Sequence, residues 1–567
     1  MKRILSFFIV LAFAVSLLAS CGTKSFDCAF TFEQIDNTQS IRISWNSENK
    51  VEKVNVIVKH GEQTVADKVF EGEDVVDMAV EVDAYYGKHN VTVKAFDSQG
   101  VVAEKSEQVA LSTEKYIIAP ISGSMPQLYF TLYMNEITNN GEIPAFVWLT
   151  RPGSWNWDKL PKNVYAVPTV DISEVTTHEN YDRMVQVMDA YVEELYSIDN
   201  NAKFELYIND YNSYLYLSLM VANGISDANC NVTLLSDGGA SYAAFNAMFN
   251  SEDPAFDADA KYADMASNLE QLCEETRREG KYLGSDSSVD FGDFKYYCYV
   301  AAREKENVEW WVLRPRAGVI CSPDEDFINR VLKEDTVARG SEAYETLERK
   351  DRVIIERNFA YPLTNMTEEE RASLKEFYNF NDEMFADAEK QGKKAMMILG
   401  SWATAENEPD FEDYAKLIME YYGDEFVYYY KGHPNTPTVN SPEKQAQLER
   451  LGIIDVESSI NAELILFFYP DIYMCGYQSS TFLSVESEDM ACAVFNTTSA
   501  AAHEVESMSE YVDLVRMFLS KIDLATSEYA SLCADETHSY YLVEFAEGEY
   551  DFAIFDATSS TFSYHKN

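Results

Sequence analysis

Three short stretches of this 567-residue chain place reactive side chains directly after predicted strands. The stretch "LLSDGGASY" carries Asp237, "YYYKGHP" carries His433, and "YMCGYQSSTF" carries Ser479 and Ser480. A carboxylate can act as a general base, and an imidazole with serine hydroxyls at a helix N-terminus can bind a phosphate. This set of groups is suited to moving a sugar from a nucleotide without a metal ion.

Each of these motifs also has an ordinary structural interpretation. Aspartate and serine are favoured N-cap residues, so Asp237 and the pair Ser479 and Ser480 can simply cap the helices that follow. His433 can be a solvated loop residue. The choice between these interpretations depends on the elements that position the side chains.

Predicted strands alternate with predicted helices through most of the chain. "KFELYIND" and "NVTLLSD" are strands, and apolar residues at helical spacing in "NYDRMVQVMDAYVEELYSI" indicate a helix before them. The same alternation resumes in "AMMILGS", "FEDYAKLIMEYYG" and "EFVYYYKG". The pattern predicts two doubly wound, Rossmann-like α/β domains at 113–385 and 386–530, followed by a C-terminal segment at 531–567. Ligands of such domains bind at the carboxyl ends of the strands, so all three motifs lie where a site is expected.

Residues 21–112 have a different pattern. From about residue 26, apolar residues alternate with period two, and turns recur every 8 to 12 residues, in "SIRISWN", "VEKVNVIVKHG" and "HNVTVKAFDSQG". This predicts a small immunoglobulin-like β-sandwich, without the inter-sheet cysteine pair of antibody domains.

Residues 1–20 are typical of a bacterial lipoprotein signal peptide. Lys2 and Arg3 precede the apolar run "ILSFFIVLAFAVSLL", and "LASC" then ends at Cys21. Cleavage before Cys21 would free that cysteine for lipid attachment, which predicts a lipid-anchored, extracytoplasmic protein of the cell envelope. The alternative is a transmembrane anchor, for which the apolar run is short.

The amino-acid composition limits the kinds of ligand and partner that the chain can be expected to bind. The formal charge of −50 argues against nucleic acid, whose phosphates need clustered Lys and Arg. The nine cysteines include no CxxC pair, so a zinc site is not expected, and the spacing does not determine any disulfide pairing. We therefore expect neither a metal nor another cofactor.

Taken together and in order, these motifs resemble the bacterial sialyltransferases that carry an Asp-Asp-Gly motif and a Lys-Gly-His-Pro motif. The resemblance runs over most of residues 126–530. It includes "FVWLTRPGSW" and "INAELILFFYPDIYMCGYQSSTF" besides the stretches above. Some members of that family also carry a lipobox and an immunoglobulin-like module.

The resemblance implies a GT-B fold and a role for each matching residue. Asp237 corresponds to the general base, and His433 to the histidine on the donor phosphate. On the donor side, the resemblance implies that nucleotide, ribose and phosphate contacts come from Lys431, Gly432, Pro434, Glu463, Ser479 and Ser480. On the acceptor side it points, more weakly, to Arg151, Asn212 and Trp402.

The acceptor side departs from the family pattern. Ser236 stands where the first aspartate of Asp-Asp-Gly is expected, and Asn212 stands where the family has a histidine. Trp402 lies two residues earlier than the family's tryptophan. The acceptor and the linkage formed are therefore undetermined.

We expect an inverting, metal-independent sialyltransferase that moves sialic acid from CMP-sialic acid to a galactose-containing glycan, with the membrane contacted only through the lipid anchor. Two alternatives remain. One is a surface lipoprotein that binds a glycan or nucleotide without turnover, which would resolve the tension that CMP-sugars are made in the cytoplasm. The other is a GT-B transferase that uses a different CMP-linked nonulosonic acid.

Overall fold

The structure is a computed structural model. It describes residues 27–75, 77–100, 102–150, 152–167, 178–237, 255–289, 298–312, 336–338, 354–357, 359–400, 411–433, 438–456, 458–477, 481, 490–496, 539–544, 551–556 and 561–566. The chain forms two compact units. The first contains the described residues up to Tyr116 together with Gln186–Lys203, and the second contains the rest.

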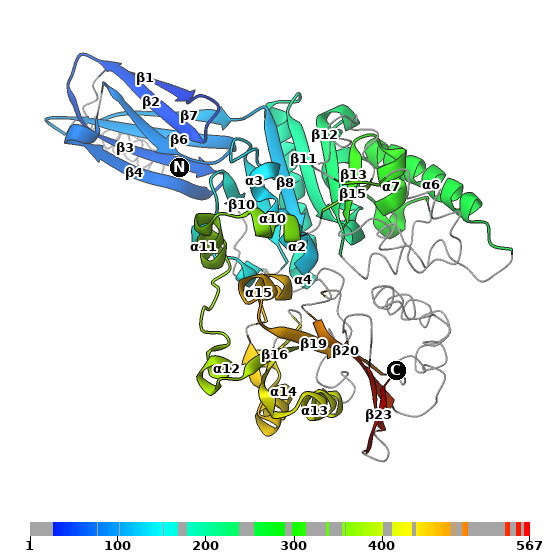
Figure 1. Ribbon diagram of the computed structural model, residues 1–567. Helices are drawn as coiled ribbons and strands as arrows, with labels where there is room; N and C mark the ends of the chain where they lie inside the picture. The colour runs from blue at the N-terminus through cyan, green and yellow to red at the C-terminus, as the bar shows by residue number, and fades with distance from the viewer. Residues whose placement is uncertain are drawn as a thin grey trace, which may run out of the picture. The chain divides into compact units, whose positions relative to one another are not determined.

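The first unit is built on two antiparallel sheets (Figure 1). One has the order β1-β2-β5 and the other β4-β3-β6-β7. Their strands are β1 (Cys28–Gln34), β2 (Ser40–Ser47), β3 (Val51–His60), β4 (Gln63–Glu71), β5 (Ala79–Asp83), β6 (Gly87–Asp97) and β7 (Val102–Leu111). Val54, Val56 and Val58 on β3 are fully buried while the residues between them are partly exposed, so the predicted period-two alternation is present.

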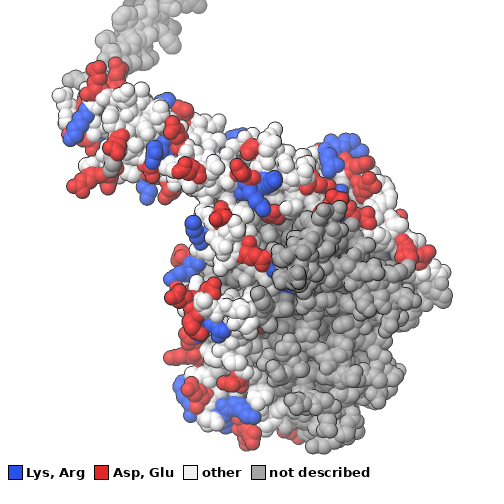
Figure 2. All heavy atoms as spheres, turned by 45° about the horizontal axis from the view of Figure 1, so that its top comes forward, with Lys and Arg blue, Asp and Glu red and all other residues white. Residues whose placement is uncertain are grey.

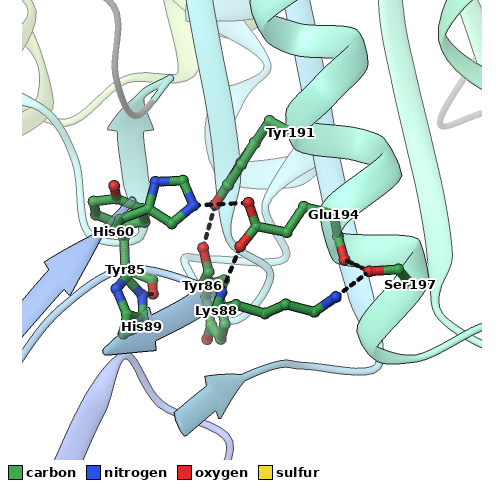
Figure 3. A network of polar contacts seen from close by, with 8 residues as sticks. All are labelled: His60, Tyr85, Tyr86, Lys88, His89, Tyr191, Glu194 and Ser197. Atoms are coloured by element: carbon green, nitrogen blue, oxygen red, sulfur yellow. Dashed lines mark hydrogen bonds and ion pairs between the residues drawn. The ribbon is translucent and has the colours of Figure 1, made fainter. Parts of the chain in front are cut away.

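The first unit also includes the second half of a helix that the sequence placed in the next domain. Helix α4 (His178–Ile198) presents Glu194, whose carboxylate accepts a hydrogen bond from the Lys88 backbone N–H and contacts His60 Nε2 at 2.7 Å (Figure 3). Tyr191 on the same helix donates from its hydroxyl to the carbonyl of Tyr86 at 2.9 Å. These contacts join the sheets to residues more than a hundred positions further along the chain.

The second unit contains an eight-stranded sheet in the order β10-β9-β8-β11-β12-β13-β15-β14. Its strands are β8 (Lys115–Ile121), β9 (Ala145–Leu149), β10 (Val164–Ala166), β11 (Lys203–Asn209), β12 (Cys230–Leu235), β13 (Val308–Val312), β14 (Thr336–Ala338) and β15 (Ile354–Glu356). Pairs β8–β9 and β11–β12 are parallel. The order runs outward on both sides of β8, so this is a doubly wound sheet whose direction changes between β8 and β11.

The helices of this part of the second unit are α2 (Ser124–Leu132), α3 (Met134–Ile137), α6 (Ala258–Glu279), α7 (Cys298–Glu304), α10 (Ala360–Asn365) and α11 (Glu368–Phe377). The strands β9 and β13 are buried at every position, as expected of strands covered on both faces.

A second eight-stranded sheet has the order β18-β17-β16-β19-β20-β21-β22-β23. Its strands are β16 (Lys394–Leu399), β17 (Phe426–Lys431), β18 (Ile454–Val456), β19 (Tyr473–Tyr477), β20 (Met490–Asn496), β21 (Ser539–Glu544), β22 (Asp551–Asp556) and β23 (Thr561–Lys566). Helix α12 (Ala386–Gln391) precedes its first strand in sequence, and the helices α13 (Phe411–Tyr422), α14 (Pro442–Leu451) and α15 (Ala462–Phe468) lie between its strands. Strands β16 to β20 pair in parallel, and β21 to β23 extend the sheet antiparallel.

The mixed α/β architecture with parallel sheets agrees with the prediction. The final three strands show that part of the predicted C-terminal segment, 531–567, continues the second sheet. Within the described part of the chain, no helix is both long enough and apolar enough to cross a membrane.

Candidate functional site

Asp237 lies one strand away from the point where the first sheet of the second unit changes direction. It follows β12 by two residues, and β12 neighbours β11, which in turn neighbours β8. The carboxyl ends of these strands therefore meet at one edge, which is the usual ligand-binding edge of a doubly wound sheet. The side chain is half-buried. The predicted location of Asp237 at a strand end is confirmed.

The Asp237 carboxylate is held by an asparagine from the neighbouring strand. Asn209, the last residue of β11, donates from Nδ2 to Asp237 Oδ1 at 3.2 Å and to the backbone oxygen of Ser122 at 2.8 Å. The other end of the amide, Oδ1, accepts from the backbone N–H of Tyr211 at 2.7 Å and caps a short 3₁₀ turn, Asp210–Asn212. These contacts determine which way the amide points.

A second carboxylate holds the main chain of Asp237. Asp210 is 1% exposed, and its Oδ1 accepts from the Asp237 backbone N–H at 3.3 Å. Its Oδ2 accepts from the indole N–H of Trp310 on β13 at 3.0 Å. A buried carboxylate needs such partners, because an unpaired one would be costly. Consecutive residues at the end of β11 thus fix both the side chain and the backbone of Asp237.

Gly123 completes the surroundings of the aspartate. It follows β8, has a φ of +91°, and approaches so closely that an added Cβ would overlap Asp237 Oδ1. It would also come within 3.2 Å of Asn209 Nδ2. Glycine is required here both for its backbone conformation and for this close approach.

On the second sheet, the predicted donor-binding residues follow strand β17. Lys431 is the last residue of β17, and Gly432 and His433 come next. The Lys431 side chain is buried, and its Nζ lies 3.4 Å from the backbone oxygen of Ser458. His433 is half-buried. β17 neighbours β16, the strand from which this sheet runs outward on both sides, so the motif lies beside a second change of direction.

Glu463 lies in the first turn of helix α15 and is buried. The residue that precedes the helix, Asn461, donates from Nδ2 to the backbone oxygen of Ser124 at 3.0 Å. We use the name bridging loop for residues 122–124, which end at the first residue of helix α2. Through it, the residues around Asp237 are connected to the helix that carries Glu463.

Several predicted residues lie outside the described part of the chain: Cys21, Arg151, Trp402, Pro434, Ser479 and Ser480. Asn212 is described and lies in the 3₁₀ turn that Asn209 caps. Sequence reasoning missed Asn209, Asp210 and Gly123. A signal for the first two was present, since "IND" ends a strand in the same way as "LLSD" does.

Among the described residues, no group of three or more His, Cys, Asp or Glu side chains is arranged to hold a metal ion. On the face drawn in Figure 2, Lys and Arg are interspersed among Asp and Glu. The described cysteines Cys28, Cys230, Cys273 and Cys475 are free thiols, and all but Cys28 are buried.

No protein-family model matches the chain, and no curated protein does. Among solved structures, a 2,6-sialyltransferase from a Vibrionaceae Photobacterium species, in a ternary complex with CMP and lactose, is 12% identical. The alignment covers 82% of this chain and 86% of that one, with a TM-score of 0.49. A sialyltransferase from Photobacterium damsela is also 12% identical, over 89% of this chain and 96% of that one, with a TM-score of 0.47. The UDP-GlcNAc 2-epimerase of Neisseria meningitidis is 9% identical over 74% and 93%, with a TM-score of 0.34. The function proposed below therefore rests on this chain's own residues.

Proposed function

We propose that this chain is a glycosyltransferase of the sialyltransferase type, with CMP-sialic acid as its donor and a galactose-containing glycan as its acceptor. The observation that carries the proposal is the placement of Asp237. It lies one strand away from a direction change of a doubly wound sheet, held by Asn209 and Asp210 and connected through the bridging loop to the helix that carries Glu463. The Lys-Gly-His motif lies at the corresponding edge of the second sheet.

The reaction follows from these roles. The acceptor hydroxyl gives its proton to the Asp237 carboxylate, and its oxygen forms a bond to the anomeric carbon of the donor. The bond from that carbon to the phosphate oxygen breaks, and its electron pair leaves with CMP. His433 would hold the phosphate as negative charge develops on it, together with Ser479 and Ser480. A single displacement of this kind inverts the anomeric configuration.

The proposal also includes further features that the sequence predicts. They are a GT-B arrangement, an immunoglobulin-like character for the antiparallel unit, a lipid anchor at Cys21 and a location in the cell envelope. They also include activity without a metal ion. Residues Lys431, Gly432, Pro434 and Glu463 would contact the nucleotide, and Arg151, Asn212 and Trp402 the acceptor.

The test is transfer by the purified chain from CMP-sialic acid to a panel of galactosides, with EDTA present. We expect release of CMP and a sialylated product. Asp237→Asn should bind the donor normally and lose roughly 10²–10⁴-fold in rate, as expected for loss of a general base. If Asp237 were only a helix cap, the variant would lose stability but keep its rate per folded molecule.

His433→Ala tests the phosphate contact separately. Loss of a hydrogen bond to phosphate costs on the order of 1–3 kcal/mol, so CMP affinity and turnover should fall roughly tenfold to a hundredfold. Unchanged CMP affinity and rate would show that His433 is a loop residue without a role in the donor site.

The second candidate function is a binding protein without turnover. Ser236 and Asn212, which replace an acidic residue and a histidine expected on the acceptor side, favour it. Hydrolysis of CMP-sialic acid must therefore be measured besides transfer. A wild-type chain that binds the donor but neither transfers nor hydrolyses it would support the binding protein. Activity with another CMP-linked nine-carbon sugar would identify a different donor.

A further inference from the structure

The orientation of the Asn209 side chain is fixed by more contacts than is usual for a residue at the end of a strand. Its side chain is 3% exposed, and both ends of the amide have partners of the correct kind. Oδ1 accepts from the Tyr211 N–H, while Nδ2 donates to the Ser122 carbonyl and to Asp237 Oδ1. A rotation that exchanged the two ends would place Oδ1 against two oxygens. The donor is therefore held toward the aspartate.

The register of the sheet explains why Asn209 can reach Asp237. β11 and β12 pair in parallel with Asn209 opposite Leu235, two residues before Asp237. The adjacent Asp210 anchors the Asp237 N–H and is itself anchored by Trp310. Gly123 leaves no room for a side chain beside Oδ1, because an added Cβ would overlap that oxygen. The carboxylate is thus held from two neighbouring strand ends, β8 and β11.

We propose that Asn209 is a positioning residue for Asp237, an inference that rests on the proposed function. A hydrogen bond donated to a carboxylate stabilises its ionised form and fixes the direction of its oxygens. Both effects serve a general base, which must be ionised before it accepts the proton of the acceptor hydroxyl and must be aimed at that proton. Asn209 acts through Asp237 and forms no bond to either substrate in this proposal.

The test compares Asn209→Asp with a matched control, Asn231→Asp. Asn231 lies on β12, the strand that leads to Asp237, but near its amino end, where it donates to Glu205 Oε1 at 2.9 Å. Both variants replace an amide that donates to a carboxylate by a second carboxylate. The partner carboxylate is Asp237 for Asn209 and Glu205 for Asn231, and Asn209 is also more buried and donates to the Ser122 carbonyl as well.

For Asn209→Asp we expect kcat to fall roughly tenfold to a hundredfold, as for the loss of a charge-assisted hydrogen bond, with the KM for the donor within about twofold of wild type. The acidic limb of the kcat–pH profile should move to higher pH, because the ionised carboxylate has lost a donor and gained a negative neighbour. Asn231→Asp should lose stability but keep the wild-type profile. Asn209→Ser replaces the amide that reaches Asp237 by a shorter hydroxyl without adding charge, so it provides the same test if the aspartate variant does not fold.

The outcomes separate the two proposals. A wild-type chain without transfer or hydrolysis would overturn the proposed function. If wild type is active but Asn209→Asp and Asn209→Ser keep the kcat and pH profile of the Asn231→Asp control, Asn209 has only a structural role and the inference is wrong. A shifted acidic limb together with reduced kcat in either Asn209 variant would support it.

Discussion

Replacement of Glu194 by alanine should selectively destabilise the first unit. The Glu194 carboxylate accepts from the backbone N–H of Lys88 and contacts the imidazole of His60, as Figure 3 shows. The side chains of His60 and Glu194 are only 17% and 19% exposed, so water does not readily replace either partner. Gly87, at the start of β6, has a φ of +135° and passes so close to Glu194 that a Cβ would lie 2.8 Å from Oε1.

The size of this destabilisation can be estimated from the two groups that lose a partner when Glu194 is removed. Loss of the acceptor leaves the Lys88 N–H in a partly buried position, which costs roughly 1–3 kcal/mol. Loss of the contact with His60 adds less than the 3–5 kcal/mol typical of a fully buried ion pair, since both side chains retain some exposure. We therefore expect Glu194→Ala to lower the free energy of unfolding of the first unit by about 2–4 kcal/mol.

Amide hydrogen exchange measures this locally. Peptides that cover β6 and the second half of α4 should exchange roughly 30- to 700-fold faster in Glu194→Ala, because each 1.4 kcal/mol is a factor of ten. Glu193→Ala is the matched control. It lies next to Glu194 on the same helix, is exposed, and makes the same change in helix propensity. Equal exchange rates in the two variants would refute this account of the contact.

Three other predictions concern the stability of the fold. Burial lowers the pKa of His89 from its ordinary value, so at acidic pH the unfolded state binds more protons than the folded state. The first unit should therefore lose stability as the pH falls below about 6.5. Denaturation measured near pH 7.5 and pH 5.5 should show this loss, and His89→Gln should reduce the difference in stability between the two pH values. Gly476→Ala should lower the free energy of unfolding by roughly 2–4 kcal/mol, because Gly476 has a φ of +139° and an added Cβ would lie 2.5 Å from a backbone oxygen of β16. The control Gly452→Ala, at a φ of +69° with open space around it, should lower it by only about 1 kcal/mol in the same thermal denaturation. Arg357→Lys should cost roughly 2–3 kcal/mol in the same assay, because lysine cannot reproduce the two hydrogen bonds of 2.9 Å to Glu136.

The parallel strands could be predicted because each is a short, mainly apolar segment that can be recognised without knowing its partners. Strands covered on both faces are continuous apolar runs, and "NVTLL" and "AFVWL" are of this kind. The position of Asp237 after such a run was sufficient to place it at the ligand-binding edge. The stretch "SYLYLSLMVANG" at 213–224 also predicts a helix, but it is helical only over 215–221, with a π-helical turn at Leu217–Val221 in which Ala222 N–H bonds to Leu217 O. The sequence carries no simple mark of that wider turn.

Contacts between distant segments could not be predicted. Of the four apolar residues at helical spacing on α4, Met188, Val192 and Leu195 are buried and Val185 is half-buried, so the spacing correctly indicated a largely buried face. Nothing in that spacing shows that Glu194, on the same helix, meets His60, because the two are 134 residues apart. The strand pattern of residues 21–112 also predicts that a chain beginning near residue 113 folds without them, and this prediction stays untested. Such a chain would, however, leave Glu194 and Tyr191 without the partners described above.

Asn209 shows the same limit within the candidate site. An Asn-Asp pair after a strand is ordinary turn chemistry, and the aspartate that it holds lies 28 positions away. Only the register between β11 and β12 brings the two together, and register is a property of strand pairing rather than of either strand alone. Residues that titrate are easily recognised in a sequence, whereas the residues that orient them are not.

The bridging loop illustrates why such orienting positions have strict requirements. Its three consecutive residues each lie beside a different group: Ser122 accepts from Asn209, an added Cβ at Gly123 would overlap Asp237 Oδ1, and Ser124 accepts from Asn461. Two of these contacts use backbone carbonyls, so they depend on the path of the chain and not on the serine side chains. That path in turn depends on the φ of +91° at Gly123. A residue with no functional group of its own therefore sets the backbone geometry on which the surroundings of Asp237 and the contact to Asn461, before helix α15, both depend.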